Sequence, residues 1–179
     1  MNYKGIFYYL GIFATLIALF SFLNILYSIY FNSVTNINSY IFSLILSFIV
    51  GISLFIAGKN SNKNISGSDQ LILMLLTFLF LPILISIPYL LSDYNFGFLN
   101  SYFESISGFT TTGFTVFQNL DNINEPLLLW RSSSQLLGGL FFLVFVIGTL
   151  GSKYIKIKPT YLLSEVNLIS NFYNNFNYN

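Results

Sequence analysis

The sequence contains no cysteine and no histidine, and charged residues are rare. It therefore has no thiol nucleophile, no disulfide, no Cys/His metal site and no ordinary proton shuttle near neutral pH, which argues against an enzyme. Only 7% of the 179 residues are charged and 55% are hydrophobic, whereas soluble domains have about 25% charged residues. The seven lysines and arginines are scattered, so no nucleic-acid partner is predicted. The composition indicates an integral membrane protein in contact with lipid, and we expect no cofactor.

Four apolar segments are long enough, at about 1.5 Å per residue, to cross a hydrocarbon layer of about 30 Å as helices. They are Gly5–Phe31, Tyr40–Gly58, about Leu71–Leu91 and about Pro126–Gly151. A signal peptide is the alternative for the first segment, but that segment is too long and no small-residue cleavage site follows it. Pro82 and Pro88 predict a kink or a broken turn in the third segment, unless neighbouring groups bind the freed carbonyls.

The cations are distributed unequally between the two sides of this four-span arrangement. All but one of the seven fall on the side of the chain start, at Lys4, Lys59, Lys63, Lys153, Lys156 and Lys158. The connection between the third and fourth spans contains Asp93, Glu104, Asp121 and Glu125 and no cation. Because lysine and arginine favour the cytoplasmic side, both termini are predicted to be cytoplasmic. Arg131 lies near the outer interface beside Trp130, where an aromatic belt and a snorkelling arginine are the simplest interpretation.

That outer connection contains a second apolar, helix-like segment, Phe96–Phe109, which is too short to span. We expect it to enter the membrane from outside and return. It leads into Thr110–Thr115, where β-branched residues disfavour a helix and Gly113 can adopt positive φ. Backbone carbonyls exposed in this way form potassium filters, although an interfacial loop with a chance threonine run is the alternative. A phosphate-binding loop is not supported, because the GxxxxGK spacing is missing.

Three motifs in order extend this hypothesis to a family. Phe103–Gly113 (FESISGFTTTG) resembles the first pore helix and filter of the Trk/Ktr/HKT superfamily, above all of bacterial TrkH-type potassium uptake subunits. Pro88–Ser92 resembles the end of the family's helix before the pore. Leu127–Ser132 resembles the start of the helix after it. The resemblance implies an all-α integral membrane fold of about four transmembrane helices with one re-entrant pore helix and a selectivity-filter loop. It divides the chain into a helix pair (1–68), a first helix–pore loop–helix repeat (69–152) and a cytoplasmic tail (153–179).

The resemblance also implies roles for individual residues. The backbone carbonyls of Thr110, Thr111, Thr112 and Gly113 would bind potassium, the transported substrate, and a threonine hydroxyl would be an inner ligand. Glu104 would set a negative field at the outer mouth or pair with Arg131, unless it is a hydrated interfacial carboxylate. Four further positions are expected to support the pore: Arg131, Gln135, which would cap a backbone group, and Gly138 with Gly139, which would allow close helix packing.

The chain also departs from the family pattern. Family members have four such repeats, whereas this chain has one TTTG, and bulky residues, Leu140–Phe142, follow the glycine pair. The sequence therefore predicts a truncated or split transporter supplying one of four pore repeats in a bacterial cytoplasmic membrane. A non-conducting interaction protein or degenerate remnant is the alternative. The resemblance implies a dimer or association with the remaining repeats, and a cytosolic nucleotide-binding regulatory subunit of TrkA type. An apolar stripe from Leu162 to Phe176 predicts an interfacial helix in the tail, with disorder as the alternative.

Overall fold

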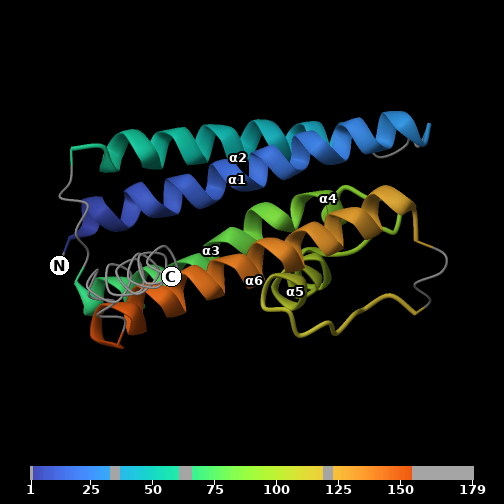
Figure 1. Cartoon of the computed structure of the whole chain (residues 1–179). Helices are drawn as coiled ribbons and strands as arrows, with labels where there is room; N and C mark the ends of the chain where they lie inside the picture. Colours follow the sequence, from blue (N-terminus) through green and yellow to red (C-terminus); the bar gives the residue numbers. More distant parts are fainter. Residues whose placement is uncertain (1, 33–36, 61–65, 119–122, 155–179) are drawn as a thin grey trace, which may run out of the picture. The chain divides into compact units, whose positions relative to one another are not determined.

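The computed structural model describes residues 2–32, 37–60, 66–118 and 123–154, and within these ranges it contains helices, turns and loops but no strand. The helices are α1 (Tyr3–Tyr30), α2 (Ile37–Gly58), α3 (Gly67–Ile85), α4 (Ile87–Leu90), α5 (Phe98–Phe109) and α6 (Glu125–Tyr154) (Figure 1). Four stretches are long and apolar enough to cross a membrane: α1, α2, α3 with α4, and α6. The predicted all-α membrane fold with four spans is therefore confirmed.

The chain divides into two compact units, residues 1–145 and 146–179, and α6 begins in the first and ends in the second. The helix contacts, the candidate site and the groove described below lie within the first unit. The predicted boundaries at residues 68 and 152 stay predictions. The apolar stripe predicted in the tail lies outside the described residues.

Helices α1 and α2 lie side by side as an antiparallel hairpin, because glycines let their backbones approach (Figure 1). A Cβ added to Gly11 would lie 2.6 Å from the backbone nitrogen of Phe55, and one added to Gly58 would lie 2.5 Å from the carbonyl oxygen of Lys4. The hydroxyls of Ser21 and Ser43 are hydrogen-bonded between the two helices at 3.1 Å. Small residues and interhelical hydrogen bonds of this kind are typical of membrane helix pairs.

The distribution of side chains is the reverse of that in a soluble helical bundle. Large apolar side chains are exposed along the outer faces of the helices, including Leu23 and Leu26 on α1 and Phe48 and Ile49 on α2. Small polar side chains are buried between the helices: Ser21, Asn24, Ser28, Ser43, Ser47 and Thr77. Because lipid solvates apolar surface, this pattern fits helices that face a bilayer.

The proline-containing span is interrupted, as predicted, and neighbouring side chains bind carbonyls beside both prolines. Pro82 lies inside α3, whereas the break between α3 and α4 falls at Ser86, because Pro88 has no N–H to offer the preceding turn. The Tyr102 hydroxyl donates to the carbonyl of Leu79 at 3.0 Å. The indole N–H of Trp130 donates to the carbonyl of Ile85 at 3.0 Å.

The interfacial belt predicted at Trp130 is wrong. Its side chain is 1% exposed and belongs to the hydrophobic core. Hydrophobicity alone could not separate the two placements, because the hydrogen bond that favours burial is made to a residue 45 positions away.

An aromatic cluster joins four helices next to the end of α5. Phe141 of α6 contacts Phe13 of α1 at a ring-centroid distance of 4.5 Å and Phe78 of α3 at 5.5 Å. Phe109, the last residue of α5, stacks on Phe141 at 6.2 Å. These rings place the end of α5 against the core, which fixes the position from which the threonine turn begins.

Candidate functional site: the threonine turn and its supports

The short helix α5 ends where its backbone meets α6. A Cβ added to Gly138 of α6 would lie 1.6 Å from the carbonyl oxygen of Phe109, so only glycine fits there. A Cβ added to Gly108 of α5 would lie 2.5 Å from the Ser134 hydroxyl oxygen. The predicted close packing at Gly138 is confirmed, and its partner is the end of the short helix.

The chain reverses direction immediately after α5, through two residues with positive φ. Thr111 has φ of 59° and Gly113 has φ of 81°. The positive φ predicted for Gly113 is confirmed, whereas that of Thr111 is unexpected, because a β-branched residue is strained there by about 1–3 kcal/mol. Hydrogen bonds hold the turn: the N–H groups of Thr112 and Gly113 both donate to the carbonyl of Ser107, at 3.1 and 3.3 Å.

The turn leaves a row of backbone carbonyl oxygens uncommitted. Within the part of the chain that the structure describes, the carbonyl oxygens of Thr110, Thr111 and Thr112 accept no hydrogen bond. The side chains of Thr111 and Thr112 are exposed. Unpaired carbonyl oxygens on an exposed turn are suitable ligands for a dehydrated monovalent cation.

Two of the threonine hydroxyls point back toward the protein. The Thr110 hydroxyl donates to the carbonyl of Ile106 at 2.7 Å and also lies 3.1 Å from the Thr112 hydroxyl. The Thr112 hydroxyl donates to the carbonyl of Ser107 at 3.1 Å. Both hydroxyls therefore stabilise the turn, whereas the Thr111 hydroxyl makes no hydrogen bond within the described residues.

A buried ion pair contacts the loop segment that follows the threonine turn. Glu104 of α5 is fully buried and its Oε2 pairs with Nη1 of Arg131 on α6. The other carboxylate oxygen, Oε1, accepts hydrogen bonds from the Thr115 hydroxyl, at 2.6 Å, and from the N–H of Val116. The carboxylate of Glu104 on α5 therefore connects the loop segment that follows the turn, at Thr115 and Val116, to Arg131 on α6.

Arg131 completes this support. Its Nη2 donates to the carbonyls of Gly113 and Phe114 at 2.9 and 3.2 Å. Arg131 is 8% exposed, so the snorkelling arginine is wrong and the alternative pairing with Glu104 is confirmed. The Gly113 carbonyl, expected to face an ion, is partly committed to this guanidinium, unlike the three threonine carbonyls, for which the described residues provide no donor.

Ser107 is a support that the sequence analysis quoted within the motif but assigned no role. Its hydroxyl donates to the carbonyl of Phe114 at 2.5 Å, and its own carbonyl accepts the two N–H groups of the turn. A serine followed by glycine at the end of a short apolar helix was the available signal. That signal does not predict Phe114 as the hydrogen-bond partner of Ser107, which depends on the path of the loop.

Thr110 and Thr111 of the turn border a cavity of about 380 Å³. It is lined by Met74, Phe78, Phe109, Thr110, Thr111, Gly138, Gly139 and Phe142. Gly139 borders the turn without crowding it, since a Cβ there would lie 3.8 Å from the Thr111 methyl group. Gln135 is half-buried one turn earlier and makes no hydrogen bond to the described residues of the turn, so its capping role stays a prediction.

A short helix and a turn with threonine backbone carbonyls lie between two helices long enough to cross a membrane, which is the order of elements that the pore-loop hypothesis predicts. Comparison with known families agrees, because the profile of the TrkH family, described as cation transport protein, matches residues 36–165. The chain belongs to the TrkH family of cation transport proteins. No solved structure matches the chain.

Individual relatives are consistent with this family. The chain is 33% identical to an uncharacterized cation transporter of Methanocaldococcus jannaschii over 79% of its own length and 29% of that protein. It is 26% identical to the Trk system potassium uptake protein TrkG of Escherichia coli, over 60% of the chain and 22% of TrkG. It is 37% identical to TrkI of Halomonas elongata, over 36% of the chain and 13% of TrkI. The chain thus spans less than a third of these relatives.

Proposed function

We propose that this chain takes part in potassium uptake across the cytoplasmic membrane as a TrkH-like subunit, with the backbone of Thr110–Gly113 as the ion-binding segment. The observation that carries the proposal is that the carbonyl oxygens of the three threonines accept no hydrogen bond from the residues that the structure describes. Such oxygens can replace the hydration shell of an ion. The family description and the names of TrkG and TrkI, potassium uptake proteins, also support potassium as the substrate.

One turn surrounds an ion on one side only, so the chain would supply one of four pore repeats. We propose that it is a truncated or split copy of a longer transporter, which its single TTTG and its short match to the relatives support. The remaining oxygens would come from other repeats or from further copies. Potassium would then move down its electrochemical gradient, with about 2.3 kcal/mol per charge from each 100 mV of membrane potential.

The supporting residues have a positioning role in this mechanism. Glu104 and Arg131 would hold the outer half of the loop, and the neutral pair would add little net charge beside the ion path. Gly138 would let the inner half begin against α6. The same proposal places the chain in a bacterial cytoplasmic membrane with both termini in the cytoplasm. A cytosolic nucleotide-binding subunit of TrkA type would regulate the transport.

Potassium uptake in cells that lack their own potassium transporters tests the proposal. We expect the 179-residue chain alone to give little uptake, and uptake to appear when it is co-expressed with the remaining repeats or with the reading frame that follows it. Gly113→Asp should then lower uptake about tenfold or more, because it adds a side chain and a charge at a position with φ of 81°.

The matched control is Gly97→Asp, which adds the same charge at the N-cap of α5, where φ is −66° and no atom lies within 4 Å of the added Cβ. Uptake should be retained in this variant. Uptake that survives Gly113→Asp would mean that the turn is not the filter. Absence of uptake under every condition would favour the non-conducting interaction protein.

A further inference from the structure

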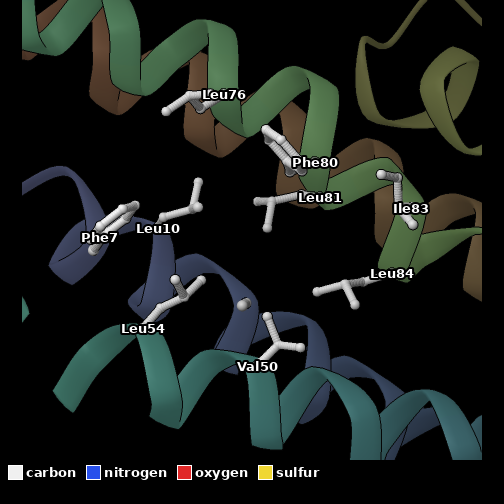
Figure 2. Close-up of a pocket in the computed structure, with 10 residues that line it drawn as sticks. Phe7, Leu10, Val50, Leu54, Leu76, Phe80, Leu81, Ile83 and Leu84 are labelled. Carbon is white, nitrogen blue, oxygen red and sulfur yellow. The ribbon is translucent and has the colours of Figure 1, made fainter. Parts of the chain in front are cut away.

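An apolar groove lies between the α1–α2 hairpin and α3, away from the threonine turn. Its volume is about 440 Å³, and Figure 2 shows its side chains converging from three helices. The lining is Phe7, Leu10, Ala14, Val50, Leu54, Leu76, Phe80, Leu81, Ile83 and Leu84, every one of them apolar. Phe7, Phe80 and Ile83 remain 40%, 52% and 40% exposed, so the groove is open on one side.

The size and chemistry of the groove exclude water as a stable occupant. A water needs two to four polar partners, whereas an apolar cavity stays dry. The volume lies within the range of about 300–1,000 Å³ that is typical of ligand pockets. If the groove were empty, its lining would lose dispersion contacts, which a flexible hydrocarbon chain from the surrounding bilayer would restore.

Two lysines stand at the cytoplasmic end of this groove. Lys4 precedes the lining residue Phe7 by one helical turn, and Lys59 directly follows the end of α2. The helix ends meet there, since a Cβ on Gly58 would lie 2.5 Å from the carbonyl oxygen of Lys4. Both lysine side chains are exposed, and within the described ranges neither forms a salt bridge.

The acidic residue described at this end does not cancel those charges by direct contact. Asp69 is 5% exposed and accepts a hydrogen bond from the Ser66 hydroxyl at 2.8 Å, at the start of α3. The lysine ammonium groups are therefore available to an anion at the membrane surface. Phosphate headgroups of the cytoplasmic leaflet lie at that depth.

We propose that the groove and the two lysines form a binding site for one anionic phospholipid of the inner leaflet. An acyl chain occupies the groove, and the phosphate lies between the ammonium groups of Lys4 and Lys59. Charge complementarity selects a lipid over a neighbouring apolar helix, which has no anion to place at the lysines. The proposal goes beyond ion transport and does not depend on the threonine turn.

Native mass spectrometry of the full chain, released from micelles supplemented with phosphatidylglycerol or phosphatidylcholine, tests this site. We expect one phosphatidylglycerol to be retained in preference to phosphatidylcholine. Combined Lys4→Gln and Lys59→Gln should remove that preference, with about a fivefold loss of affinity for each lysine. Val50→Phe, which fills the groove from α2, should abolish retention.

The control is Ile49→Phe, which adds the same bulk on the same helix at a side chain that is 59% exposed and outside the groove. A second measurement uses the unaltered chain: phosphatidylglycerol with a photoreactive acyl chain should cross-link to peptides that contain Leu10, Leu54 or Leu76. Equal retention of the two lipids, cross-linking only elsewhere, or a dimer that excludes lipid from the groove would overturn the proposal. None of these readouts depends on potassium uptake.

Discussion

Gly138 and Gly139 are adjacent on α6, but they meet very different surroundings. A methyl group on Gly138 would overlap the carbonyl oxygen of Phe109 at 1.6 Å, whereas one on Gly139 would have its nearest contact at 3.8 Å. We predict that Gly138→Ala destabilises the fold by about 1–3 kcal/mol through overpacking. Gly139→Ala should be neutral, or stabilising by about 0.5–1 kcal/mol, because alanine favours a helix.

Unfolding of the purified chain in mixed micelles, followed by circular dichroism, measures both variants, and each serves as the control for the other. Equal stability of the two would mean that α5 does not end against α6 as described. If Gly139→Ala were the more harmful variant, the turn would lie closer to α6 at Thr111 than at Phe109.

The strained conformation of Thr111 shows how single residues depend on their surroundings. A threonine at φ of 59° persists only where neighbouring interactions outweigh the strain. Here the Ser107 carbonyl, the packed end of α5 and the Glu104–Arg131 pair provide those interactions on both sides of the turn. The conformation that exposes the carbonyls is therefore stabilised by residues that do not themselves offer oxygens to an ion.

Apart from α4, which belongs to the same candidate span as α3, α5 is the one helix in the described ranges that is too short to cross a membrane. Its 12 residues measure about 18 Å, well short of a hydrocarbon layer of about 30 Å. The predicted short helix is confirmed, whereas its re-entry from the outer face stays a prediction.

We predict that α5 enters and leaves the membrane on the outer side. Because the chain has no native cysteine, single cysteines at Asn95 and Gln118 can be labelled selectively. Both should react in intact cells with a membrane-impermeant maleimide. A cysteine at Lys59 should react only after the membrane is permeabilised, which provides the control. Labelling at only one of the two outer positions would show that the segment crosses the bilayer.

Considered as a whole, the chain combines lipid-facing apolar surfaces with a strong asymmetry of charge. The described helices expose large apolar side chains and bury small polar ones. All but one of the cations fall on the side predicted to be cytoplasmic, and the exception, Arg131, is neutralised by Glu104. The buried pair therefore removes the one cation that would weaken the asymmetry.

We predict from this asymmetry that reporter fusions after Lys63 and after Asn122 lie on opposite sides of the membrane. Alkaline phosphatase should be active at Asn122 and inactive at Lys63, and a fluorescent protein that folds only in the cytoplasm should give the reverse. Two fusions on the same side would contradict the four-span topology. Substituting Lys59 and Lys63 with Gln tests the cause, since it should weaken the preference for one orientation.

The sequence by itself determined the membrane class, the four spans to within a few residues, the short helix before the threonine run and the positive φ of Gly113. These features are local: apolar length sets a span, and a glycine among β-branched residues marks a turn. The family resemblance also follows from contiguous motifs. Each of them could be recognised without knowing which helices are neighbours.

Only the tertiary structure decided which side chains meet. It paired Arg131 with Glu104 across 27 residues and turned Trp130 inward to Ile85 across 45. It also committed the Gly113 carbonyl to Arg131, whereas the carbonyls of the three threonines accept no hydrogen bond within the described ranges. An arginine near a helix start has the same sequence signature whether it snorkels or is buried. The difference arises from which helix faces pack together, because a buried charge is stable only where the fold supplies its partner.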